Sequence, residues 1–160
     1  MKWLDSVIEA RKRGSFEEAM QILTEELTKN PKDGRIHYQM AWTHDALGKE
    51  TDAAPVYERA IALGLNDTDL EGAYLGLGST YRCLGEYQKS LATFNTAIEL
   101  FPKNNAFHIF KSLTMYNLGQ PDESIRILLE KLVATTADDK IKTYGRALLF
   151  YSDKLSQKFE

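Results

Sequence analysis

The histidines and the cysteine are the side chains of this chain best suited to catalysis or metal binding. His37 and His44 are seven residues apart, which is about 10.5 Å along a helix at about 1.5 Å per residue. Two ligands of one metal on the same helix need a spacing near i, i+4, so this pair predicts no metal site. Cys83 is the only cysteine, so neither an intramolecular disulfide nor a multi-cysteine metal site is expected.

Other groups of residues resemble known sites only in part. Asn66-Asp67-Thr68-Asp69 is rich in oxygen ligands, but it lacks the glycine and the terminal glutamate of a calcium loop. Gly76-x-Gly78 lies within a predicted helix and does not follow a strand, so it is no nucleotide-binding fingerprint. Serine, histidine and aspartate all occur, but no motif brings them together. We therefore expect no catalytic residue, no metal and no cofactor.

The composition is that of an ordinary globular protein. The chain has 160 residues, 43% of them hydrophobic and 27% charged, which is enough for one domain with a substantial core. Its net charge of −3 argues against a general nucleic-acid binder. No signal peptide is visible, and no stretch of about 20 apolar residues could cross a membrane. We expect a cytoplasmic protein with no nucleic-acid or membrane partner.

Regularly spaced glycines divide the chain into units. Helical periodicity runs nearly throughout, and strand-like alternation is absent. The glycines recur at intervals of about 34 to 37 residues, each where a helical hairpin should turn: Gly14, Gly48, Gly85 and Gly119. The best-formed unit reads Tyr74-x2-Leu77-Gly78-x2-Tyr81, followed by Gly85, Tyr87, Phe94, Ala97 and Pro102.

This spacing resembles the tetratricopeptide repeat, whose pattern is W-x2-L-G-x2-Y, then A-x3-F and a final P. Tyr74 stands in place of the tryptophan, and Ser90 in place of the alanine before Phe94. The resemblance covers essentially the whole chain, and it is strongest in the third repeat and weakest in the fourth. The layout is also similar to small, single-domain bacterial members of the family with four repeats and a closing helix.

The resemblance implies an all-α fold, a right-handed superhelical solenoid of four helical hairpins with a C-terminal capping helix. A single domain, 1–160, would hold repeats at about 1–32, 33–66, 67–102 and 103–136 and a closing helix at about 137–158, nine helices in all. Thr68-x-x-Glu71 reads as a capping box at the start of the third hairpin. An apolar stripe at helical spacing marks the closing helix: Ile141, Tyr144, Leu148, Tyr151 and Leu155. We expect this helix to cover the hydrophobic face of the last repeat.

The resemblance also implies a concave groove, lined by the first helix of each hairpin, that binds peptides or partner proteins. Carried onto this sequence, the groove positions are Arg35, Tyr38, Trp42, Gly72, Leu75, Gly76, Ser79, Arg82, Ile109, Phe110, Leu113 and Tyr116, with Leu4, Ile8 and Arg11 at the N-terminal end. Family members that clamp acidic chaperone tails have Lys and Asn where this chain has Leu4 and Ile8. That clamp is missing here, and a hydrophobic segment fits this apolar, aromatic groove better. An acidic group of the ligand could pair with Arg82.

Alternatives remain open at the glycines and aromatic residues of this groove. Gly72 and Gly76 either form a hollow for a ligand backbone or accommodate a bulky neighbour such as Trp42 or Phe110. Trp42 and Tyr38 are either interface residues or are covered by the protein's own helices.

The sequence therefore predicts an adaptor or scaffold, not an enzyme, that binds a peptide or partner protein segment in its groove. The alternative is a homo-oligomer, in the simplest case a homodimer, that associates through the groove or through an N-terminal face of Trp3, Leu4 and Ile8. We expect no helix before Trp3 to cover the first repeat, which favours this alternative.

Overall fold

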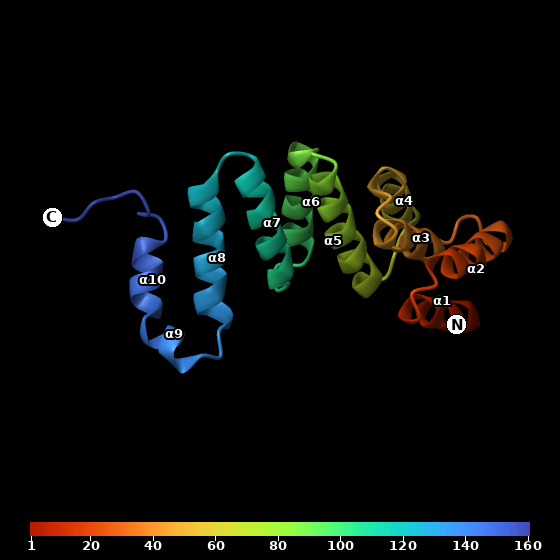
Figure 1. The fold of residues 1–160 in the computed structure, drawn as a ribbon, viewed down its shortest axis with the longest axis horizontal. Coiled ribbons are helices and arrows are strands. Elements are labelled where there is room, and N and C mark those ends of the chain that lie inside the picture. Colours follow the sequence, from red (N-terminus) through yellow and green to blue (C-terminus); the bar gives the residue numbers. More distant parts are fainter. The chain divides into compact units, whose positions relative to one another are not determined.

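The computed structural model describes residues 1–160, and all its regular elements are α-helices (Figure 1). The chain divides into two compact units, Met1–Glu86 and Tyr87–Glu160. The first unit holds α1 (Lys2–Lys12), α2 (Phe16–Lys29), α3 (Gly34–Ala46), α4 (Glu50–Leu63) and α5 (Asp67–Cys83). The second holds α6 (Tyr87–Leu100), α7 (Asn105–Asn117), α8 (Pro121–Thr135), α9 (Asp139–Thr143) and α10 (Gly145–Tyr151). The boundary falls at the turn between α5 and α6, inside the predicted third repeat.

The predicted hairpin turns are confirmed. Gly14, Gly48, Gly85 and Gly119 have φ values between 68° and 76°, the left-handed region in which glycine avoids a steric penalty. The residue after each glycine donates its backbone N–H to the carbonyl five residues earlier, at 2.9–3.0 Å. This is the hydrogen bond of a Schellman motif, which ends a helix and satisfies one of its last carbonyls. All four hairpins therefore turn in the same way.

Small residues and one large tyrosine build the core of the first unit. Between α1, α2 and α3, the buried side chains are Val7, Ala10, Ala19, Leu23 and Ile36, all 0% exposed. Between α3, α4 and α5, a second cluster surrounds Tyr57, which is 1% exposed. Its other buried members are Ala41, Ala53, Ala54, Ala73, Leu77 and Tyr81. The alanines allow the helices to approach closely, and Tyr57 fills the space that remains.

The start of α5 differs from the predicted capping box at Thr68. The N-cap is Asn66, whose side-chain oxygen accepts the backbone N–H of Asp69 at 3.1 Å. The Asn66 amide in turn donates to the Asp69 carboxylate at 2.7 Å. Asparagine is among the best N-cap residues and ranks above threonine, so the helix begins two residues earlier than the Thr68 pattern indicates. Asp69 is thereby buried at the first turn of α5, 7% exposed.

The second unit packs its core from α6, α7 and α8. Phe94, Ala97 and Phe107 are 0% exposed. Buried hydroxyls accompany them: the Oγ of Ser90 lies 2.8 Å from the Oγ1 of Thr114, and each side chain is 0% exposed. The pair satisfies two polar groups that would be costly to bury alone.

The C-terminal segment differs from the predicted single helix over 137–158. The structure has two short helices, α9 and α10, joined at Tyr144, and no helix after Tyr151. Gly145 is buried against α8, where an added Cβ would lie 3.1 Å from Cγ1 of Val133. Glycine weakens a helix interior by about 1 kcal/mol, and its close approach to α8 marks the point where the predicted helix breaks.

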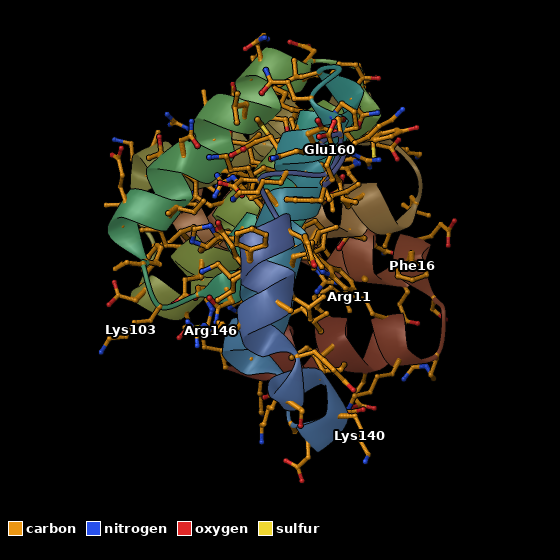
Figure 2. The ribbon with its side chains drawn as sticks, turned by 90° about the vertical axis from the view of Figure 1, so that its left-hand side faces the viewer. Arg11, Phe16, Lys103, Lys140, Arg146 and Glu160 are labelled. Atoms are coloured by element: carbon orange, nitrogen blue, oxygen red, sulfur yellow. The ribbon has the colours of Figure 1, made fainter.

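The C-terminal segment packs against the last repeat through α10 and α8, but three residues of the predicted apolar stripe remain exposed. Tyr144 is 65% exposed, Tyr151 49% and Leu155 40%. The aromatic rings of Phe150, Tyr151 and Phe159 pack against one another, Tyr151 edge-on to the other two, with centroids 5.3–6.0 Å apart. We call these three residues the C-terminal aromatic patch. Figure 2 looks onto α10, with Lys140 of α9 and Arg146 of α10 labelled.

Candidate functional site

The two helix glycines of the predicted groove lie against tyrosines of the protein itself. A Cβ added at Gly72 would overlap the Tyr38 hydroxyl and lie 2.9 Å from its Cζ. At Gly76 it would overlap the Tyr57 hydroxyl and lie 2.7 Å from its Cε1. Of the two open alternatives, the structure favours accommodation of a bulky neighbour. The neighbours are Tyr38 and Tyr57, in place of the Trp42 or Phe110 named from the sequence.

A carboxylate holds the hydroxyl end of Tyr57. Asp45 of α3 accepts hydrogen bonds from the Tyr57 hydroxyl and from Thr80 Oγ1, the latter at 2.9 Å. Burial raises the pKa of Asp45 above its ordinary value, although these two hydrogen bonds oppose the shift. The carboxylate therefore links α3, α4 and α5 and is occupied by the protein's own groups.

Arg35 is already neutralised by an internal carboxylate. Its Nε lies 2.9 Å from Oδ2 of the buried Asp69, and its side chain is 32% exposed. The same aspartate is held by the N-cap of α5, so Arg35 joins the second and third hairpins. Arg82, the cation proposed from the sequence to meet an acidic ligand, is half-buried on α5.

Arg11 is held differently, by neutral acceptors on α3. Its NH1 donates to Gln39 Oε1 at 2.6 Å and its NH2 to the Gln39 carbonyl at 2.5 Å. Thr43 Oγ1 accepts from Nε at 3.2 Å and from NH2 at 2.7 Å. The guanidinium carbon also lies 4.0 Å from the centroid of the Trp42 ring, a cation–π contact. The sequence placed Arg11 at the end of the groove but did not identify Gln39 and Thr43 as its partners.

Trp42 is partly covered by Arg11 and remains 41% exposed. Together with Ile8, Arg11 and Lys12 it lines a surface hollow of about 330 Å³. Ile8 is 38% exposed, so the walls of the hollow offer apolar surface beside two cationic side chains. Of the two aromatic residues left open from the sequence, Trp42 keeps an accessible face, whereas Tyr38 is half-buried against the core.

The remaining predicted residues of the first unit are less accessible. Leu75 and Ser79 on α5 are half-buried. Trp3 packs against the first core cluster and Leu4 is half-buried, so the predicted N-terminal face offers mainly Ile8.

In the second unit, the predicted groove residues lie on α7, and their side chains differ in solvent exposure. Ile109 and Phe110 are half-buried, and the Phe110 ring packs 6.4 Å from that of Phe94. Leu113 is 40% exposed and Tyr116 66% exposed. Two of the four side chains thus present large apolar surface to solvent.

The histidines and acidic residues are dispersed over the structure. No group of three or more His, Cys, Asp or Glu residues is placed to hold a metal ion. The three histidines, His37, His44 and His108, are half-buried, and burial lowers the pKa of His108. None of the helices has the length and apolar character needed to cross a membrane.

Comparison with known proteins identifies the repeat. Residues 34–155 match the family model described as Tetratrico peptide repeat. Aspartyl/asparaginyl beta-hydroxylase of Mus musculus is 27% identical over 162 aligned residues, which cover 96% of this chain and 22% of that enzyme. The chain thus spans about a fifth of the length of that relative.

Solved structures agree on the fold. MamA (41-end) from Desulfovibrio magneticus RS-1 has a TM-score of 0.73 at 20% identity, over 94% of this chain and 84% of that one. YrrB, described as a TPR protein with an unusual peptide-binding site, has a TM-score of 0.72 at 16% identity, over 91% and 73%. These repeats form an all-α scaffold that typically serves protein–protein interaction. The chain belongs to the tetratricopeptide repeat family.

Proposed function

We propose that this protein is a non-enzymatic adaptor that binds a peptide or partner protein segment on the first helices of its hairpins. The observation that carries this proposal is the partly exposed Trp42 on α3, whose ring is held in place by Arg11 beside a surface hollow. Tryptophan and arginine are enriched among residues that dominate binding energy, and a ring that is already ordered loses little entropy on binding.

Two further observations support the adaptor. On α7, Leu113 and Tyr116 add exposed apolar surface at corresponding first-helix positions. YrrB, a structural neighbour with the same fold, is itself described as having a peptide-binding site. Fold likeness at 16% identity does not transfer that site, so the proposal rests on the exposed side chains of this chain.

The test compares variants of exposed apolar residues on first and second helices. Trp42→Ala and Tyr116→Ala would be used with Leu100→Ala, a residue of α6 that is 53% exposed, as the matched control. Circular dichroism establishes that each is folded. Affinity capture from the native host, followed by binding measurements with the purified partner, should show a loss of at least about tenfold for Trp42→Ala or Tyr116→Ala. Leu100→Ala should bind like the wild type. A partner held equally by all variants would place the interface elsewhere.

Self-association is the second candidate, and one observation favours it. The C-terminal aromatic patch leaves Phe150 51%, Tyr151 49% and Phe159 54% exposed. Contiguous exposed apolar surface commonly marks an interaction site. Light scattering of the full chain should then give a mass above that of one copy, and Phe150→Ser/Phe159→Ser should return it to that of one copy. A wild-type protein that remains monomeric at high concentration would eliminate this candidate.

A further inference from the structure

Arg11 is a half-buried cation with no carboxylate beside it. Its four hydrogen bonds all go to neutral acceptors of Gln39 and Thr43, and no acidic side chain lies within ion-pair distance of it. A guanidinium has five N–H donors, so one N–H of the NH1 group remains without an acceptor. Arg35 and Arg126, by contrast, contact Asp69 and Glu123 respectively.

Burial changes the pKa of the Arg11 guanidinium. Loss of solvent lowers the pKa of Arg11 to about 10, and the nearby Tyr38 and Tyr57 oppose the shift only in part. The side chain therefore stays charged at neutral pH while lacking both full hydration and a counterion. An arriving anion would meet a cation that has already lost part of its hydration, which reduces the desolvation cost of forming the pair.

The surroundings of Arg11 define what else a ligand must carry. The hollow of about 330 Å³ is walled by the Trp42 ring and Ile8, both partly exposed, and is bordered by Lys12. The Lys12 ammonium is paired with Glu9 at 2.8 Å. The local excess of positive charge in the hollow therefore comes from Arg11, and the apolar walls favour a large hydrophobic side chain next to the anion.

The position of Arg11 in α1 limits the kind of anion that can bind beside it. Arg11 lies in the last turn of α1, where the partial negative charge of the helix end opposes a strongly acidic ligand. Capture of a chain-terminal carboxylate relies on converging backbone N–H groups, and a helix end of this kind presents carbonyls. A single acidic side chain that accepts the remaining NH1 hydrogen fits this site better.

We propose that the hollow of Ile8, Arg11, Lys12 and Trp42 binds a partner segment by one Asp or Glu side chain paired with Arg11 and an adjacent large apolar side chain against Trp42. This inference rests on the proposed adaptor function and names the chemistry of its ligand. It also moves the predicted acidic contact from Arg82 to Arg11.

The test is a selection of random short peptides displayed on phage against the full-length protein. Wild type, Arg11→Gln and Arg13→Gln would be compared. Arg13 is a suitable control because it is close in the chain, carries the same charge, and pairs with the exposed Glu18 at 3.0 Å. Peptides selected by wild type and by Arg13→Gln should contain Asp or Glu beside Phe, Trp, Leu or Ile. Their synthetic forms should bind Arg11→Gln about tenfold more weakly, and higher ionic strength should weaken wild-type binding.

Two readouts separate a binding effect from a folding effect. In a Trp3→Phe background, Trp42 is the remaining tryptophan, and its emission should change when a selected peptide is added. Arg11→Lys restores the charge but not the fork of donors, so it should recover part of the affinity. Peptides without an acidic preference, or with affinity unchanged in a folded Arg11→Gln variant, would overturn this inference while leaving the adaptor function intact. Selection of no peptide above a folded unrelated control, or of peptides whose binding is unchanged in Trp42→Ala, would count against both.

Discussion

Aromatic side chains of the second hairpin and those of the C-terminal aromatic patch are held in two different ways. In the second hairpin, two rings have a polar partner from another helix: Asp45 accepts from the Tyr57 hydroxyl, and Arg11 lies over Trp42. In the patch, Phe150, Tyr151 and Phe159 contact mainly one another and are about half exposed.

The repeat gives its aromatic side chains partners from other helices that the C-terminal segment lacks. Within the repeats, Tyr57 has one position because Gly76 leaves room for it and Asp45 orients its hydroxyl. Beyond the last repeat, the one cation over a ring is Lys154, 4.6 Å from the Phe150 centroid and only four residues away in the chain. The three rings otherwise gather by hydrophobic contact, which has no preferred direction. We expect stability to depend strongly on the first arrangement and weakly on the second.

The largest effect should follow removal of the carboxylate that holds Tyr57. Asp45→Ala leaves the buried Tyr57 hydroxyl without its acceptor and removes one of the two acceptors of Thr80, whose Oγ1 also donates to the Gly76 carbonyl at 2.8 Å. We expect a loss of about 2–3 kcal/mol in the free energy of unfolding, because an unsatisfied buried donor costs more than the hydrogen bond itself contributes. Urea denaturation measures it. Asp52→Ala, exposed on the first turn of α4, is the control and should cost less than about 1 kcal/mol. Equal losses would show that Asp45 does not hold Tyr57.

A smaller effect is expected from filling the space that the helix glycines leave. Gly76→Ala adds a methyl group against the buried Tyr57, and overpacking of this kind costs about 1–3 kcal/mol. The higher helix propensity of alanine offsets about 1 kcal/mol of that cost. Gly72→Ala meets the free end of Tyr38, which is half-buried and can move, so it should be nearly neutral. The two thermal midpoints should therefore differ, with Gly76→Ala the lower. A stabilised Gly76→Ala protein would contradict the fit of Tyr57 against α5.

The smallest effect is expected in the C-terminal aromatic patch. Phe159 is 54% exposed and contacts Phe150 and Tyr151 by its ring. Phe159→Ala should lower the free energy of unfolding by about 0.5–1.5 kcal/mol, the value of an aromatic pair beyond its buried area. A dilute sample avoids any contribution from self-association. A loss as large as that of Asp45→Ala would mean that the patch is held as firmly as the repeats, and the comparison would fail.

The parts that the sequence predicted well depend on local spacing. A glycine needed for a left-handed turn and a small or large side chain at a packing position recur with the repeat, so Gly85, Phe94 and Ala97 could be placed from the pattern alone. The all-α repeat fold followed from them. The capping box at Thr68 failed because a better N-cap, Asn66, stands two residues before it.

The structural features that the sequence pattern did not predict depend on contacts between hairpins. The space beside Gly72 and Gly76 belongs to tyrosines of the preceding hairpin, and no spacing rule links these positions. Gln39 and Thr43 lie 28 and 32 residues from Arg11 in the chain. Their role as acceptors becomes visible only when α1 and α3 are packed together. The break at Gly145 likewise reflects a close approach to α8, beyond the last unit of the repeat.

The identical closure of the four hairpin turns has a consequence for how such a chain can grow. Each turn uses a left-handed glycine and one hydrogen bond spanning five residues, and neither depends on which hairpin it connects. A duplicated gene segment encoding one hairpin would therefore carry its own working connector. The copy could be inserted in register without a new loop having to arise, and its first-helix surface would be free to diverge toward another ligand.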